Sequence, residues 1–173
     1  MAPFRHVLLA LFLGSAPLAA AHSAASQLTA PPVFAVIVHR SNPIDGVTFS
    51  ELRRMFMLDT QTWPHGRKIT VVLREKGQRE RSEAIRVICG LSEAAYEKYV
   101  LLRVFQGHVS IGPRSILSSS GMLRFVSSAP GAIGYVAADE VDASVKVLRI
   151  DNLLPGDPQY RVRRSEPTLE VAW

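Results

Sequence analysis

At 173 residues and a formal net charge of +5, the chain has room for one domain with a proper core and carries a modest basic excess. That excess suits an anionic ligand or a negatively charged membrane surface, whereas the scattered basic residues argue against nucleic acid as a partner. Cys89 is the single cysteine, so no disulfide can form within the chain. Its apolar neighbours favour a small buried side chain over a reactive nucleophile.

The first 21 residues are predicted to be a cleavable signal peptide that exports the protein to the periplasm. Arg5 and His6 precede an apolar run at 7–13, and alanines at 19–21 offer small residues for cleavage after Ala21. The run is well short of the roughly 20 residues that a membrane-spanning helix needs. Residues 22–32, rich in Ala, Ser and Pro, are predicted to be a flexible leader.

The rest of the chain alternates between strand and helix patterns. Continuous β-branched runs predict buried strands, and apolar residues three and four apart predict helices that bury one face. In chain order the predicted elements are a strand at 33–38, a helix opened by Thr48, a strand at 68–73, a helix at 78–89, a helix from Ser92 to about Phe105, a short helix after Ser120, and strands at 132–137 and 145–150. Strands alternating with helices indicate an α/β domain with a sheet covered on both faces.

Local signals mark several element ends. Thr48 and Glu51 have the spacing of a capping box, and Gly90 is typical of a helix C-terminus. The helix that follows is expected to bury one apolar face, made by Tyr96, Tyr99, Val100 and Val104. The domain is predicted to cover residues 33–154, and residues 155–173 are expected to be a loosely ordered tail.

Three segments, taken in order, resemble the substrate-binding proteins of phosphate ABC transporters. They are residues 49–56 with the turn Trp63-Pro64-His65-Gly66, the strand 69–73 with Arg74-Glu75-Lys76-Gly77, and the stretch 120–136, which contains Pro130-Gly131-Ala132-Ile133-Gly134-Tyr135-Val136. The last of these is the most specific. The resemblance implies a single periplasmic-binding-protein-like lobe of type II, with a mixed sheet flanked by helices.

Two departures from the family pattern stand out. Full-length members have two lobes that close on the ligand, and this chain matches only about the second. The family's phosphate loop reads R-x-x-G-S-G-T. Arg74 and Gly77 match it, whereas Gln78, Arg79 and Glu80 replace the residues after the glycine.

The change from strand to helix after Arg74 is also a physically reasonable anion site. A helix start presents free backbone N–H groups, and its dipole favours negative charge. A guanidinium can hold a phosphate with parallel hydrogen bonds. The predicted ligand-binding residues are Arg74, Gly77, Gln78, Arg79, Ser119 and Ser120. In the alternative interpretation, Arg79 lies on a solvated helix surface and Ser118 to Ser120 form only a helix cap.

The leading hypothesis is an exported protein that binds phosphate or a related oxyanion for an ABC transporter or a sensor. The alternative is a periplasmic interaction module that keeps the fold without the ligand and docks to a membrane protein. A homodimer with a cleft between two copies is a third possibility. No nucleophile, acid/base pair or metal-ligand spacing stands out, so no enzyme activity, metal or cofactor is predicted.

Overall fold

The computed structural model describes residues 33–163 and has a five-stranded sheet at its centre, in the order β4-β3-β5-β1-β6. These strands are β1 (Phe34–His39), β3 (Thr70–Arg74), β4 (Arg114–Ile116), β5 (Ala132–Ala137) and β6 (Val145–Val147). β3 runs parallel to β4 and β5, whereas β1 runs antiparallel to β5 and β6. The sheet is therefore mixed, as the resemblance implied. A short parallel pair, β2 (Gly46–Val47) and β7 (Arg149–Ile150), lies outside it.

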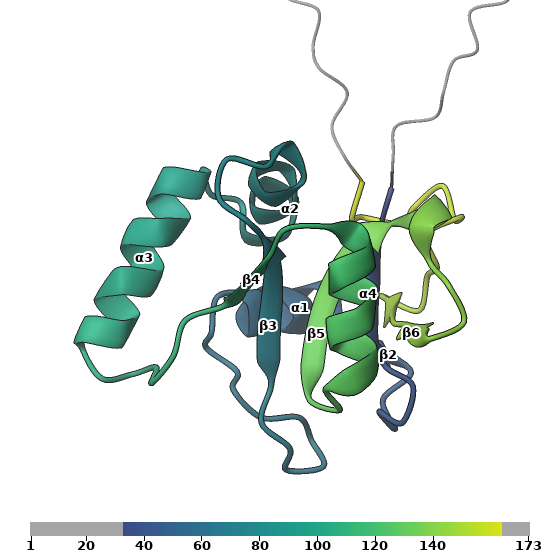
Figure 1. Ribbon diagram of the computed structural model, residues 1–173, viewed down its shortest axis with the longest axis horizontal. Coiled ribbons are helices and arrows are strands. Elements are labelled where there is room, and N and C mark those ends of the chain that lie inside the picture. The colour runs from purple at the N-terminus through teal and green to yellow at the C-terminus, as the bar shows by residue number, and fades with distance from the viewer. Residues whose placement is uncertain (1–32, 164–173) are drawn as a thin grey trace, which may run out of the picture.

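Helices cover both faces of the sheet, as the alternating pattern predicted (Figure 1). They are α1 (Phe49–Phe56), α2 (Arg79–Cys89), α3 (Glu93–Phe105) and α4 (Ser119–Ser128), with a short 3-10 turn, η1 (Ala138–Glu140). α4 packs on one face, and its Met122 and Val126 meet Val72 of β3 in one apolar cluster. α1 and α2 pack on the other face. α3 stands at the outer flank, beyond β4.

The predicted helix-end signals are confirmed. The Thr48 hydroxyl accepts a hydrogen bond from the Glu51 N–H at 3.2 Å, and the Glu51 carboxylate accepts one from the Thr48 N–H at 2.8 Å, which completes the capping box. Gly90 ends α2 in the left-handed conformation with a φ of 70°. Ser92 caps α3 by accepting from the Ala95 N–H at 3.2 Å.

Two glycines explain why the stretch from Pro130 to Val136 has its particular sequence. A Cβ added at Gly131 would lie 2.2 Å from the Lys68 carbonyl oxygen, and one added at Gly134 would lie 2.7 Å from the Met122 sulfur. Gly131 lets the backbone before β5 approach the backbone before β3, and Gly134 lets α4 pack closely on the sheet. The Gly131 carbonyl also accepts from the Thr70 N–H at 3.0 Å.

Two predictions about strands were wrong in detail. The predicted strand at 145–150 is two strands in different sheets, because the chain turns inward at Leu148. That residue is fully buried, and its N–H donates to the Val36 carbonyl at 2.8 Å. β4 lies between two predicted helices, where no strand was predicted, and its three residues are too few to give a periodic signal.

The buried face predicted for α3 is mostly absent. Tyr96 is buried and donates from its hydroxyl to the Phe56 carbonyl at 2.7 Å. Tyr99 and Val100 are half-buried, and Val104 is exposed. The reason is that α3 packs on α2 rather than across the sheet, so one side of it has no cover.

The domain extends past its predicted boundary at residue 154. Tyr160 and Val162 are buried, and the Val162 carbonyl accepts from the Phe34 N–H at 3.0 Å, so residues 155–163 pack beside β1. The predicted signal peptide (1–21), leader (22–32) and last tail residues (164–173) lie outside the described residues. Within 33–163, no helix has the length and apolar character to cross a membrane.

Gly131→Ala is expected to lower the free energy of unfolding by at least about 2 kcal/mol, because the new methyl group would force two backbone segments apart. Urea unfolding followed by circular dichroism measures this. Gly156→Ala is the matched control, since an added Cβ there meets nothing within 4 Å. Equal stability of the two variants would contradict the close-approach explanation.

Candidate functional site

The direction of the Arg74 side chain follows from the alternation of residues along β3. Val71 and Leu73 belong to the apolar cluster under α1 and α2, and Val72 belongs to the cluster under α4. Successive side chains of a strand point to opposite faces. Arg74, two residues after Val72, therefore emerges on the α4 face at the end of the strand.

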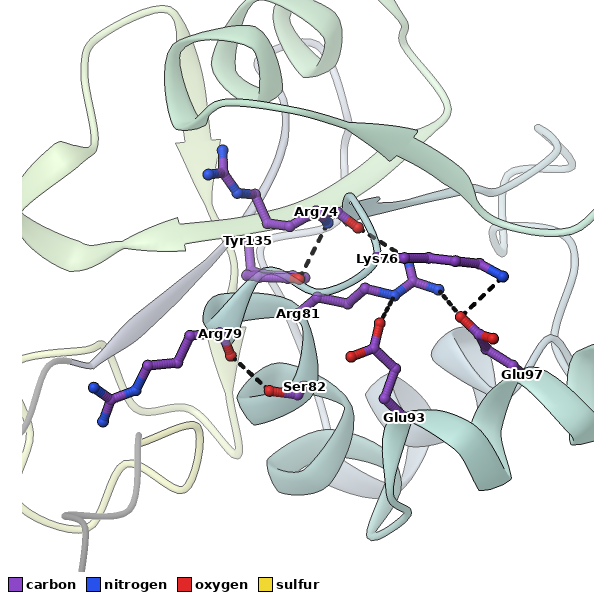
Figure 2. Close-up of polar contacts among 8 residues, drawn as sticks. All are labelled: Arg74, Lys76, Arg79, Arg81, Ser82, Glu93, Glu97 and Tyr135. Atoms are coloured by element: carbon purple, nitrogen blue, oxygen red, sulfur yellow. Dashed lines mark hydrogen bonds and ion pairs between the residues drawn. The ribbon is translucent and has the colours of Figure 1, made fainter.

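The Arg74 side chain is half-buried, and two atoms of its guanidinium lack a partner within the described residues. Its Nε and Nη1 atoms are shielded from solvent, and neither has a hydrogen-bond partner within the described part of the chain. Figure 2 shows it pointing away from Lys76 and Arg81. Burying a charged donor without a partner costs free energy, so this geometry is suited to an acceptor that arrives as a ligand.

The backbone of Arg74 is held on both sides. Its N–H donates to the Tyr135 hydroxyl at 3.2 Å, and its carbonyl accepts from Arg81 Nη1 at 2.9 Å (Figure 2). Burial raises the pKa of Tyr135, so the phenol stays neutral. Tyr135 was not among the predicted site residues. Its position in the glycine-rich stretch is a signal, but its contact with Arg74 depends on the pairing of β3 with β5.

The start of α4 lies close to Arg74 through strand pairing. Ile116, the last residue of β4, is the register partner of Arg74, and α4 begins three residues later. The Ser118 hydroxyl caps the helix by accepting from the Gly121 N–H at 3.0 Å. Within the described chain, the N–H groups of Ser119 and Ser120 have no hydrogen-bond partner. The structure thus brings Arg74, Ser119 and Ser120 to the same end of the sheet.

Gly77 and Gln78 lie in a turn on the α2 side. Gly77 has a φ of 77°, which only glycine adopts readily, and Gln78 occupies the N-cap of α2 without making a side-chain cap bond. Two amides of the turn are already occupied, since the Glu75 N–H donates to the Ile116 carbonyl and the Gln78 N–H to the Glu75 carbonyl, at 3.1 and 3.2 Å. The Arg74 guanidinium does not point into this turn.

Arg79 is engaged elsewhere. Its Nε lies 2.7 Å from a carboxylate oxygen of Glu83, one turn further along α2, and its side chain is 63% exposed. Figure 2 shows its guanidinium extending in a different direction from that of Arg74. The structure does not bring Arg79 together with Arg74, Ser119 and Ser120.

Arg81 is a structural cation. It is 5% exposed, and its Nε lies 2.7 Å from a carboxylate oxygen of Glu93, on α3. A carboxylate oxygen of Glu97 lies 3.7 Å from Arg81 Nη2 and 3.0 Å from Lys76 Nζ. Together with its bond to the Arg74 carbonyl, this guanidinium joins the end of β3 to α2 and α3.

Among residues 33–163, the remaining reactive side chains form no second candidate site. Cys89 is fully buried, and burial raises the pKa of its thiol to about 12, so no thiolate is available at neutral pH. Across residues 33–163, no group of three or more His, Cys, Asp and Glu side chains is placed to hold a metal ion.

The fold is that of one lobe of a periplasmic binding protein, so the resemblance seen in the sequence is confirmed for the fold. The chain is similar to an ABC-type phosphate transport receptor from Vibrio cholerae, with a TM-score of 0.62, 20% identity, and coverage of 77% of this chain and 54% of the receptor. It is also similar to a phosphate ABC transporter substrate-binding protein from Clostridium perfringens, solved with bound phosphate. The TM-score is 0.62 and the identity 21%, with coverage of 77% of this chain and 53% of that protein. For PstS from Borrelia burgdorferi the TM-score is 0.61 and the identity 13%, with coverage of 78% of this chain and 55% of PstS.

The chain therefore spans about half the length of these solved proteins. The first is named as a transport receptor and the second as a substrate-binding protein. No protein-family model matches the chain, and no curated protein matches it.

Arg81→Met is expected to lower the free energy of unfolding by about 1 to 3 kcal/mol, because it leaves the Arg74 carbonyl and two glutamates without their shared cation. Hydrogen exchange should rise most in α3, which the cation ties to α2. Urea unfolding and amide exchange measure the two effects.

Arg86→Met is the control for that substitution, since Arg86 is an exposed arginine on the same helix, and its loss should cost less than about 1 kcal/mol. An Arg81→Met protein that matches this control in stability and in α3 exchange would refute the structural role of Arg81.

Proposed function

We propose that this chain binds phosphate or a related small oxyanion at the end of β3, with Arg74 as the principal contact. The observation that supports the proposal is the pair of buried, unpartnered guanidinium atoms, Nε and Nη1, on the α4 side of the sheet. Both atoms carry N–H donors for the oxygens of a tetrahedral oxyanion, and charge-assisted bonds of this kind are stronger than neutral ones.

The start of α4 supplies the other donors. The N–H groups of Ser119 and Ser120 and the hydroxyl groups of both residues offer hydrogen bonds without adding a negative charge, and the helix dipole favours an anion there. Residues 118–138 contain no Asp or Glu, so no carboxylate from this segment repels the ligand. Gly77 and Gln78 shape the facing turn, and Arg79 contributes only to the general positive field.

The proposed role is that of an exported solute-binding protein that works in the periplasm with an ABC transporter or a sensor. The chain covers about half of the similar solved proteins, and in the proposed role a membrane protein or a second copy of this chain supplies the surface that closes over the ligand. An anion facing water on one side is held weakly, because solvent and salt screen its charge.

One observation favours the second candidate, an interaction module that keeps the fold without a free ligand. The turn after Arg74 lacks the hydroxyl donors of the family pattern, and the N–H groups of Glu75 and Gln78 already have protein acceptors. In this case the end of β3 would receive an acidic side chain of a partner, bound by the same guanidinium.

Arg74→Gln is expected to weaken binding of inorganic phosphate by at least about tenfold, because it removes a charge and a pair of parallel donors. Isothermal titration calorimetry of the full chain with phosphate, with sulfate and acetate for comparison, measures this. Arg79→Gln, a change of the same type in a guanidinium already paired with Glu83, should alter the affinity less than about twofold.

Two outcomes would contradict the proposal. If the unsubstituted chain shows neither heat nor a thermal shift at millimolar phosphate, the chain does not bind the free anion. If Arg79→Gln abolishes binding and Arg74→Gln does not, the ligand sits in the α2 turn instead.

A further inference from the structure

The exposed large hydrophobic side chains of the described residues are concentrated in one stretch of sequence. Phe105 is 88% exposed, Ile111 76% and Leu101 69%. The stretch 101–117 holds all of these exposed side chains except Leu154. Scattered single apolar residues on a surface need no explanation, but a cluster of this kind marks an interaction site.

Helical spacing places the apolar side chains of α3 on one face. Leu101 and Phe105 are four residues apart, Leu102 and Phe105 three apart, and Lys98 precedes Leu101 and Leu102 by three and four. These four residues therefore share one side of α3. This helix stands at the outer flank of the molecule, where the described residues provide no layer beyond it (Figure 1).

The loop after α3 returns beside the same helix. A Cβ added at Gly112 would lie 3.3 Å from Val100, and Gly112 and Pro113 line a groove together with Leu101 and Val104. The loop therefore covers the side of α3 that carries Val100 and Val104 and leaves the side that carries Phe105 open. We call Lys98, Leu101, Leu102 and Phe105 the α3 surface.

Charge distinguishes this surface from an ordinary apolar patch. Residues 98–138 contain no Asp or Glu, whereas they contain Lys98, Arg103, Arg114 and Arg124. Arg103 is paired with Asp59 at 2.9 Å. Lys98 has no ion-pair partner among the described residues, whereas the Arg114 guanidinium lies over the Phe125 ring of α4 and not beside α3. Glu97, one turn before Leu101, is paired with Lys76 at 3.0 Å, so the unpaired charge beside the apolar side chains is positive.

We propose that the α3 surface docks onto an anionic lipid bilayer. Leu101, Leu102 and Phe105 would enter the boundary between headgroups and acyl chains, and Lys98 would contact acidic headgroups. Charge complementarity favours a membrane over a second copy of the chain, because two such surfaces would place like charges against each other. This inference does not depend on the proposed anion site, which lies at the end of β3.

Co-sedimentation of the full chain with phosphatidylcholine vesicles containing about 30% phosphatidylglycerol tests the proposal. Binding is expected to the anionic vesicles, to fall at high salt, and to be weak with phosphatidylcholine alone. Leu101→Ser/Phe105→Ser should reduce the partition coefficient by more than about tenfold, since it removes two inserting side chains. Lys98→Glu should reduce it by about fivefold or more, since it reverses a charge next to the inserting side chains.

Matched controls keep the test specific. Leu154→Ser removes an exposed leucine outside the surface, and Arg149→Glu reverses an exposed charge outside it, so both should bind like the unsubstituted chain. Circular dichroism and thermal unfolding confirm that each variant is folded.

Three results would overturn the proposal. One is equal vesicle binding by the α3-surface variants and the controls, which would place the contact elsewhere in the chain. Another is the absence of vesicle binding. The third is sedimentation velocity showing a dimer that Leu101→Ser/Phe105→Ser dissociates, which would assign the surface to a second copy.

Discussion

The buried Arg81 guanidinium is the interaction on which the rest of the site depends. It donates to the Arg74 carbonyl at 2.9 Å, lies 2.7 Å from Glu93, and thereby fixes the end of β3 relative to α2 and α3. A second buried cation on the same side would be repelled by it. The α2 side of the strand end is therefore occupied by a structural cation, and Arg74 is left to present its charge on the α4 side.

The same interaction explains why α3 can keep an uncovered face. Most helices of this size are held by an apolar stripe, but only Tyr96 of α3 is buried. Ion pairs from Arg81 and Lys76 to Glu93 and Glu97 secure the first half of the helix. The second half is consequently free to expose leucine and phenylalanine. A helix that is anchored in its first half and exposed in its second half is suited to contact a partner outside the domain.

Features that depend on neighbouring residues could be predicted from the sequence, whereas features that depend on tertiary packing could not. The capping box at Thr48, the left-handed Gly90 and the glycine-rich stretch before β5 are decided by neighbouring residues or by close backbone approach. The face of the sheet on which Arg74 emerges depends on the apolar cluster to which Val72 belongs. The burial of α3 depends on its packing against α2. The strand pattern at 145–150 is continuous, but its first half pairs with β1 and its second half with β2. The direction of a side chain, the burial of a helix and the partner of a strand are known only once the sheet is assembled.

Titration of the protein with inorganic phosphate, monitored by nuclear magnetic resonance of arginine side chains and backbone amides, tests the central claim most directly. The account predicts that the Arg74 Nε–H signal and the amides of Ser119 and Ser120 shift together in a saturable way, while the Arg79 side chain stays unchanged. If the amides of Gly77 to Glu80 respond and the Arg74 guanidinium does not, the anion site is on the α2 side and the account is wrong.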